Sequence, residues 1–422
     1  MQEYIIKGSN KGVRGSIDIS GAKNSCLPLL ASSILFEDAV TFKNIPLTAD
    51  VLTMCKLLEA LGSKVKISEK NKSIKIINKK KHKLIVSYKL VSTMRAGVLT
   101  MGALLGRYQK NQIFVAQSGG CSLGNRNINF HIAGFKRLGA KYSLKKGYIN
   151  ISTKRGLIGN VFRFPKVSVT GTSNLIMASV FARGVTHLKN VSCEPEVLDL
   201  IDWLNKSGAQ IRFKGKRTIK ITGVKKLKGG THEIIADRIE AFSYLCVAVI
   251  TRGKIKLNNI NPKFLTSELQ VLKKMGCNIE LKSSSIELNA NKKVKPIKIK
   301  TGPFPNFATD NMPMLMAVLT TVEGKSEIVE TIFSNRYMAA GELTRMGASI
   351  SIKGSKAIII GKKILHGAEC ISSDLRTTFA IILGAIAAKG TSRISRIYHG
   401  FRGYYNLEKK LQKIGINIKK LL

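Results

Sequence analysis

Apolar residues repeat one pattern six times along the chain. In each copy an apolar helix precedes a short alternating strand, an amphipathic helix, a glycine and two further strands. In the first copy, residues 23–36 are nearly all apolar or small, residues 40–45 alternate as a strand, and residues 50–61 have helical amphipathic spacing. Further strands are predicted over residues 64–68 and 73–77. The repeat therefore predicts a β-α-β-α-β-β unit with a sheet outside and one buried helix inside.

A glycine ends the amphipathic helix in every copy, where a left-handed C-cap is expected. These glycines are Gly62, Gly139, Gly208, Gly276, Gly347 and Gly415. Their spacing of about 70 residues is longer than the roughly 20 to 50 residues of solenoid repeats. Six such units in a chain of 422 residues are expected to form two domains of three units each.

The predicted inner helices begin with polar or charged residues before they turn apolar. Their starts are expected near Lys23, Arg95, Thr172, Asp237, Asp310 and Asp374. Asp, Ser, Thr and Asn are ordinary N-caps, so Asp310 alone could be nothing more than a helix cap. Lys23, Arg95 and Arg376 instead oppose the helix dipole, and a bound anion would reverse that conflict. We therefore expect these starts to line a cleft between two domains that binds phosphate-bearing substrates.

Composition excludes some classes of function. Seventy Lys and Arg against 25 Asp and Glu give a net charge of +45, which raises the possibility of nucleic-acid binding. The basic residues are spread along the chain and aromatic residues amount to 6%, so we interpret the charge as a solvated surface. The seven cysteines form no CxxC pair, and the histidines lack metal-binding spacing. We predict a reduced, cytoplasmic protein with no metal, organic cofactor, membrane span or specific nucleic acid.

A glycine-rich loop over residues 118–126 holds Cys121 close to Arg126. The loop lacks the GK[ST] ending of a phosphate-binding P-loop. A single cysteine is most often a small buried filler. Here the flanking glycines and the nearby cation favour an exposed, reactive thiol.

Ten segments in fixed order resemble one family over essentially the whole chain. They are SGAKN (20–24), TMRAG (93–97), GGCSLG (119–124), R-x-x-x-x-H (126–131), EPEVLDL (194–200), DRIE (237–240), FPNFATD (304–310), ETIFSNRYM (330–338), DLR (374–376) and RGY (402–404). Together they resemble the UDP-N-acetylglucosamine 1-carboxyvinyltransferases, which are enolpyruvyl transferases. The resemblance implies an α/β fold of two inverted, barrel-like domains with an interdomain active site. It places one domain at residues 22–235, with a mobile Cys121 loop, and the other at residues 1–21 plus 236–422.

The resemblance implies transfer of the enolpyruvyl group of phosphoenolpyruvate to the 3-hydroxyl of UDP-N-acetylglucosamine, with release of phosphate. This is the first committed step of peptidoglycan synthesis, and it needs no cofactor. The shikimate-pathway enolpyruvyl transferase is an alternative with the same fold. The sequence GAKN and the cysteine loop favour the UDP-sugar enzyme. The alternative that is not an enzyme is a degenerate, basic nucleic-acid-binding protein on the same scaffold.

Site residues follow from the same resemblance. Asp310 is the expected base, and Cys121 is the expected acid and the target of the inhibitor fosfomycin; Lys23 and Arg402 are also expected to be catalytic. Phosphoenolpyruvate is expected at Lys23, Asn24, Arg95, Arg126, Arg376 and Arg402. UDP-N-acetylglucosamine is expected at Arg95, Arg126, Asn127, Ile128, Asn129, Phe130, His131, Lys166, Val167, Ser168, Val169, Asp310 and Ile332. Asn127 and Asn129 replace the family's usual Pro and Asp, which bears on affinity for the UDP-sugar more than on reaction type.

Overall fold

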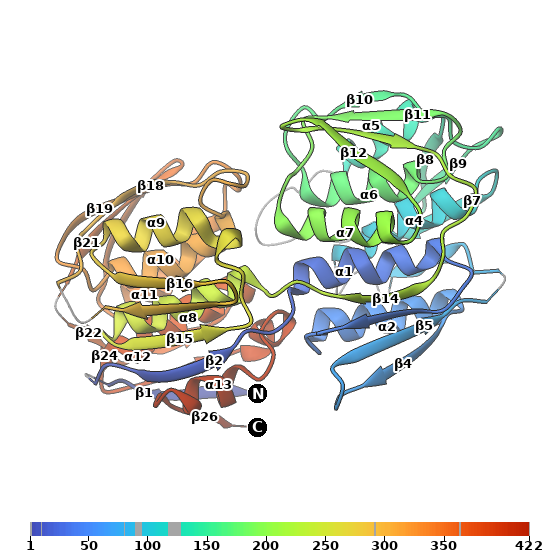
Figure 1. Cartoon of the computed structure of the whole chain (residues 1–422). Coiled ribbons are helices and arrows are strands. Elements are labelled where there is room, and N and C mark those ends of the chain that lie inside the picture. Colours follow the sequence, from blue (N-terminus) through green and yellow to red (C-terminus); the bar gives the residue numbers. More distant parts are fainter. Residues whose placement is uncertain are drawn as a thin grey trace. The chain divides into compact units, whose positions relative to one another are not determined.

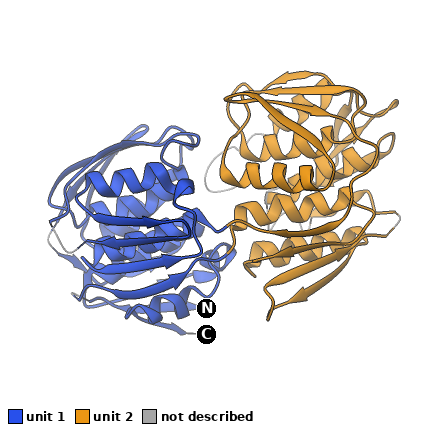
Figure 2. Ribbon diagram, viewed as in Figure 1, with its two compact units in different colours: residues 1–20, 121–124, 236–422 blue, residues 21–120, 125–235 orange. Residues whose placement is uncertain are grey.

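The chain forms two compact units, each with its own hydrophobic core (Figure 1). A computed structural model describes residues 2–9, 11–79, 81–88, 95–116, 128–290, 293–362 and 364–421. Of the described residues, unit 1 contains those up to residue 20 and those from residue 236 onward, and unit 2 contains those from residue 21 to residue 235 (Figure 2).

Three inner helices pack against one another in the centre of unit 2. They are α1 (Lys23–Ser32), α4 (Leu99–Arg107) and α6 (Val169–Ser179). Their side chains are buried on nearly all sides, as their apolar sequences predict. Three amphipathic helices accompany them: α2 (Ala49–Leu61), α5 (Asn129–Arg137) and α7 (Pro195–Lys206). Only one face of each outer helix is buried, so these helices cover the unit's core.

Three four-stranded sheets complete unit 2. The first consists of β6 (Ile85–Val86), β7 (Gln112–Ala116), β9 (Tyr148–Ser152) and β8 (Lys141–Lys145). The second consists of β10 (Val161–Arg163), β11 (Val185–Lys189), β13 (Thr218–Thr222) and β12 (Gln210–Gly215). The third consists of β14 (Gly230–Glu233), β3 (Val40–Lys43), β5 (Ser73–Ile77) and β4 (Lys64–Ser68). In every sheet the first two strands are parallel and the others antiparallel, so one topology is used three times.

Unit 1 repeats this plan. Its inner helices are α8 (Arg238–Ile250), α10 (Met312–Leu319) and α12 (Leu375–Ala387), and its outer helices are α9 (Thr266–Lys274), α11 (Ala339–Arg345) and α13 (Leu407–Lys413). One sheet consists of β18 (Lys298–Lys300), β19 (Gly324–Val329), β21 (Lys356–Gly361) and β20 (Ser349–Lys353). A second consists of β2 (Arg14–Asp18), β15 (Lys254–Asn258), β17 (Ser285–Asn289) and β16 (Asn278–Lys282). The third consists of β23 (Glu369–Ile371), β25 (Thr391–Ser395), β1 (Glu3–Lys7) and β26 (Asn417–Leu421), and a short pair joins β22 (Leu365–His366) to β24 (Ala388–Lys389).

The predicted α/β repeat, with sheets outside and buried helices inside, is confirmed. The predicted strand order is wrong in three of the six copies, because one strand of the sheet comes from outside the copy. β14 supplies the first strand of the copy that contains α1, while β2 supplies the equivalent strand of the copy that contains α8. β1 supplies the last strand of the sixth copy. Strand pairing depends on backbone hydrogen bonds between distant segments, which a local pattern of apolar residues does not encode.

All six predicted C-cap glycines have positive φ, between 91° and 110°. Gly208, after α7, has a φ of 105°, and a Cβ added there would meet no atom within 4 Å. Any cost of adding a side chain at this position therefore comes from the backbone and not from crowding.

Replacing Gly208 with alanine is expected to lower the free energy of unfolding by about 1 kcal/mol, because alanine disfavours the left-handed conformation. Gly341 is the matched control: it lies inside α11 and an added Cβ would also meet no atom within 4 Å. Gly341→Ala is expected to be neutral or to stabilise by up to about 1 kcal/mol, since alanine favours a helix. Urea unfolding measures both variants. Equal stability of the two would contradict the assignment of Gly208 as a strained cap.

Candidate active site

A carboxylate held between two buried arginines forms the centre of the candidate site in unit 1. Asp310 belongs to the 3-10 helix η4 (Thr309–Asn311), which leads into α10. Its carboxylate accepts hydrogen bonds from Nη2 of Arg336 and, at 3.0 Å, from Nη2 of Arg376. Arg336 also donates from Nε to the carbonyl of Thr309 at 3.0 Å. Asp310 is not the N-cap residue of η4 or of α10, so the simple capping alternative is wrong.

Arg376 carries a buried positive charge at the start of α12. Burial is the largest effect and lowers the pKa of its guanidinium, but Asp310, Tyr404 and Asp237 together outweigh burial and raise that pKa above its ordinary value. The guanidinium carbon lies 5.6 Å from the ring centroid of Tyr404, and burial raises the pKa of the Tyr404 phenol to about 12. The Arg376 side chain therefore stays cationic and is held by both the carboxylate and the ring.

Asp374 caps α12, as the sequence predicts. Its Oδ1 accepts from the backbone N–H groups of Arg376 at 2.8 Å and Thr377 at 3.2 Å.

Arg402 ends the 3-10 helix η6 (Ile397–Arg402), which packs against α12. Burial first, and then the charge of Arg402, lower the pKa of His399, while Asp374 opposes this effect. Unit 1 thus brings Asp310, Arg376 and Arg402 to the same end of its inner helices, and Ile332 is exposed after β19.

In unit 2 the start of α1 presents Lys23 and Asn24. The Nζ of Lys23 lies 3.2 Å from Oδ2 of Asp50, which belongs to the first turn of α2. Both side chains are largely buried, with exposed fractions of 11% and 6%. Asp50 was missed at the sequence level, because an acidic residue in a helix's first turn is commonplace. Arg95 begins the 3-10 helix η2 (Arg95–Val98), which continues into α4, and its side chain lies outside the described part.

The two segments expected to bind the UDP-sugar lie together in unit 2. Residues 128–131 form the start of α5, and residues 166–169 lead into α6; these helices pack against each other. Nε2 of His131 lies 3.4 Å from Oγ1 of Thr170, which follows the second segment directly. Lys166, Val169 and Asn129 are exposed, and Ile128, Phe130, Val167 and Ser168 are half-buried. α6 begins at Val169, three residues before the predicted Thr172, because Ser168 is the cap and accepts from the N–H of Gly171.

His131 differs from its neighbours, because its side chain is only 4% exposed. Nδ2 of Asn174 donates to its Nδ1 at 2.8 Å, and Oδ1 of Asn174 accepts from the N–H of Gly102 at 2.7 Å. Burial lowers the pKa of His131 to about 4. The described contacts therefore tie its ring to the interior between α4, α5 and α6. Cys121, Arg126 and Asn127, which are also among the predicted site residues, lie outside the described residues.

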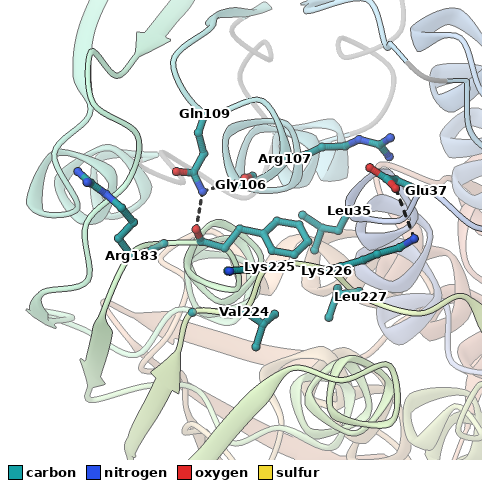
Figure 3. Close-up of a pocket in the computed structure, with 13 residues that line it drawn as sticks. Leu35, Glu37, Gly106, Arg107, Gln109, Arg183, Val224, Lys225, Lys226 and Leu227 are labelled. Atoms are coloured by element: carbon teal, nitrogen blue, oxygen red, sulfur yellow. Dashed lines mark hydrogen bonds and ion pairs between the residues drawn. The ribbon is translucent and has the colours of Figure 1, made fainter.

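A cavity of about 450 Å³ in unit 2 lies away from the predicted site residues (Figure 3). It adjoins the end of α4, where Nη1 of Arg107 donates to the carbonyl of Ile34 at 2.7 Å. Nearby, Nε2 of Gln109 donates to the carbonyl of Phe181 at 2.6 Å, and Lys226 pairs with Glu37 at 3.6 Å. Arg107 and Gln109 therefore satisfy carbonyls at the ends of helices, which is helix capping, while Lys226 and Glu37 form an ion pair of exposed side chains. Lys23, Asp310 and Arg376, which are among the predicted site residues, lie instead at helix starts.

Within the described ranges, no helix is long and apolar enough to cross a membrane. The same ranges hold no group of three or more His, Cys, Asp or Glu side chains placed to bind a metal ion.

Comparison with known proteins places this arrangement in a family. The model of the EPSP synthase family (3-phosphoshikimate 1-carboxyvinyltransferase) matches residues 8–411, so the chain has the enolpyruvyl transferase fold and family signature. Within that class it belongs to the UDP-N-acetylglucosamine 1-carboxyvinyltransferase family. The relative of this name from Pelagibacter ubique is 43% identical over 421 residues, with complete coverage of both chains. Those from Bartonella quintana and Coxiella burnetii are each 41% identical, and the match covers 100% and 96% of their lengths.

Solved structures agree on the fold. The enolpyruvyl transferase NikO from Streptomyces tendae superposes with a TM-score of 0.89 over 99% of this chain and 98% of its own. EPSP synthase from Acinetobacter baumannii gives a TM-score of 0.77 with complete coverage of both chains. Both are 19% identical to this chain, so the likeness concerns the fold.

The burial of His131 makes stability depend on pH. Its pKa in the folded chain, about 4, is below the ordinary 6.5, so its contribution is fully present above pH 6.5. That contribution is lost as the pH falls from 6.5 towards 4, by about 3 kcal/mol at most. Unfolding free energies at pH 7 and pH 4.5 are expected to differ less in His131→Gln than in the unmodified chain. The exposed His366 supplies a control, His366→Gln. An unchanged pH dependence in the His131 variant would contradict this account.

Proposed function

We propose that this chain transfers the enolpyruvyl group of phosphoenolpyruvate to the 3-hydroxyl of UDP-N-acetylglucosamine and releases phosphate. The observation that carries the proposal is full-length identity of 43% to a relative named UDP-N-acetylglucosamine 1-carboxyvinyltransferase. The described residues support it: in unit 1 Asp310 lies between Arg336 and Arg376, and in unit 2 Lys23 lies at the start of α1. The reaction would provide the first committed intermediate of peptidoglycan, needed for cell wall, cell shape and division, in the cytoplasm.

The proposed mechanism has two steps and uses no metal or organic cofactor. In the first step, Asp310 accepts the proton of the sugar 3-hydroxyl, and the hydroxyl oxygen adds to C2 of phosphoenolpyruvate. At the same time, C3 of phosphoenolpyruvate takes up a proton from Cys121. The product is a tetrahedral phospho-ketal. In the second, C3 loses a proton and the C2–O bond to phosphate breaks, which yields the enol ether and inorganic phosphate. Each step needs an acid and a base that exchange roles.

The cations have distinct tasks in this mechanism. Arg376 and Arg402 suit the carboxylate and phosphate of phosphoenolpyruvate, because a guanidinium pairs with planar or tetrahedral anions through two donors. Lys23 provides a point charge, and Asn24, Arg95 and Arg126 complete the anion site. Arg336 and Arg376 hold the Asp310 carboxylate in a fixed orientation. Residues 127–131, 166–169 and Ile332 serve the UDP-sugar.

We further assign residues 22–235 and residues 1–21 plus 236–422 as two enolpyruvyl transferase domains. The compact units support this division, because their boundaries in the sequence fall at residues 20–21 and 235–236. The shikimate-pathway reaction is the second candidate. The family model is named for it, but the EPSP synthase structure is 19% identical to the chain, against 41–43% for the UDP-sugar relatives.

Purified protein is expected to release phosphate from phosphoenolpyruvate when UDP-N-acetylglucosamine is present. A continuous assay for inorganic phosphate measures this, with shikimate 3-phosphate as the competing acceptor. Release only with shikimate 3-phosphate would replace the proposal with the shikimate reaction. No release with either acceptor, together with salt-sensitive DNA binding, would favour the alternative that is not an enzyme.

The same assay includes Arg402→Ala, which is expected to lose about 10²- to 10³-fold in rate, the usual cost of one preorganised electrostatic donor. Its control is Arg14→Ala, an exposed arginine of β2 outside the proposed site, which is expected to keep full activity. Near-normal turnover of Arg402→Ala would remove that residue from the mechanism.

Cys121 is expected to be alkylated by fosfomycin, whose phosphonate resembles the phosphate of phosphoenolpyruvate. Intact mass should show one adduct, and peptide digestion should map it to residues 119–126, with faster labelling when the UDP-sugar is bound. Cys121→Asp should resist labelling yet keep activity, because a carboxylic acid can replace the thiol as proton donor. Cys121→Ser should turn over poorly, since a hydroxyl is a much weaker acid. An adduct on any other cysteine, or full activity in the serine variant, would leave Cys121 without a chemical role.

A further inference from the structure

We propose that Asp199, with Ser25 and His232, is a positioning group that fixes the start of α1 and so places Lys23 and Asn24. The carboxylate of Asp199 lies on α7, where Oδ2 accepts a hydrogen bond from the hydroxyl of Ser25. The same Oδ2 lies 3.4 Å from the backbone N of Ile235, and Oδ1 lies 2.8 Å from Nε2 of His232 on β14. One carboxylate therefore joins three segments of unit 2.

The start of α1 needs such a group because it lacks an ordinary cap. Its N-cap residue is Ala22, whose side chain cannot accept a hydrogen bond, and its first turn contains no acidic residue. The inner helices α6, α8 and α12 are capped instead by the side chains of Ser168, Asp237 and Asp374. Lys23 makes the shortage worse, since a cation in the first turn opposes the helix dipole.

Asp199 supplies the missing negative charge from a neighbouring helix. Ser25 is the third residue of α1, so its hydroxyl connects the carboxylate to the first turn. Ser25, Asp199 and His232 are at most 5% exposed, and buried charges of this kind are usually retained only when they are hydrogen-bonded. The ring of His232 packs 5.6 Å from that of Trp203, which limits its rotation and keeps its Nε2 directed at the carboxylate.

Lys23 is consequently restrained at both ends. Asp50 pairs with its ammonium group at 3.2 Å, while the Ser25–Asp199 contact fixes the turn from which its side chain leaves the backbone. The N–H of Ala22 also donates to the carbonyl of Ile235 at 2.7 Å, next to the amide that faces Asp199. Because an error of about 1 Å in position can cost up to about 10²-fold in rate, this restraint matters for catalysis. The inference rests on the proposed function, in which Lys23 and Asn24 bind phosphoenolpyruvate.

Ser25→Ala tests the group with little risk to folding, because Asp199 keeps its contacts with His232 and Ile235. We expect the KM for phosphoenolpyruvate to rise about tenfold, with the KM for UDP-N-acetylglucosamine unchanged at saturating phosphoenolpyruvate. The control is Ser33→Ala. Ser33 follows the C-terminal end of α1, is equally buried, and its hydroxyl donates to the carbonyl of Leu30. The two variants should melt within about 2 °C of each other. Equal KM values for phosphoenolpyruvate in the two variants would overturn the proposal.

Two substitutions of His232 provide a second test. His232→Leu removes the donor to Asp199, so we expect the KM for phosphoenolpyruvate to rise as in Ser25→Ala. His232→Gln keeps an N–H donor, so its KM for phosphoenolpyruvate should return towards that of the unmodified chain. Failure of the glutamine variant to bind phosphoenolpyruvate better than the leucine variant would also overturn the proposal. Amide hydrogen exchange over residues 22–26 is independent of turnover, and it should be faster in Ser25→Ala than in Ser33→Ala. A chain that releases no phosphate but shows this exchange difference contradicts the proposed function and supports the positioning role.

Discussion

Burying an inner helix on all sides is the constraint on which the rest of this structure depends. The apolar side chains of the six inner helices fill the two cores, so the helices can display polar chemistry only at their ends. At the C-terminal ends the unpaired carbonyls are satisfied locally, as Arg107 and Asn78 do for the carbonyl of Phe36. The N-terminal ends carry the residues that the proposed chemistry needs.

Carboxylates organise those N-terminal ends in two different ways. Asp237 and Asp374 accept from backbone amides of the helices they precede, which is ordinary capping. The other carboxylates bridge instead to side chains of other elements. Asp310 holds Arg336 and Arg376, Asp50 holds Lys23, and Asp199 holds Ser25. In a chain with 70 basic and 25 acidic residues, each buried carboxylate has many possible partners. The close contacts made by Asp310 and Asp50 therefore show that Arg336, Arg376 and Lys23 are held in place.

The fold could largely be predicted from the sequence because its determinants are local. The pattern predicted β4 and β5 with the observed bounds and α2 within one residue, and all six glycines predicted to end the outer helices have positive φ. The local pattern could not place β1, β2 and β14, since their partners lie far away in the sequence. Only the resemblance assigned residues 1–21, which contain β1 and β2, to the same domain as residues 236–422. The same limit applies to the site: resemblance named Asp310 and Lys23, but only tertiary structure pairs them with Arg336 and Asp50.

Specificity for the acceptor has a different origin from the fold. NikO and EPSP synthase share the architecture at 19% identity, so the packed helices and sheets tolerate replacement of most side chains. Acceptor choice must then depend on residues that the core does not need. In unit 2 the exposed Asn129, Lys166 and Val169 meet this condition, while His131 does not, because Asn174 ties it to the interior. In the proposed site, His131 would serve the UDP-sugar by holding the start of α5 in place, so that a scaffold shared with other enolpyruvyl transferases supports a site of its own.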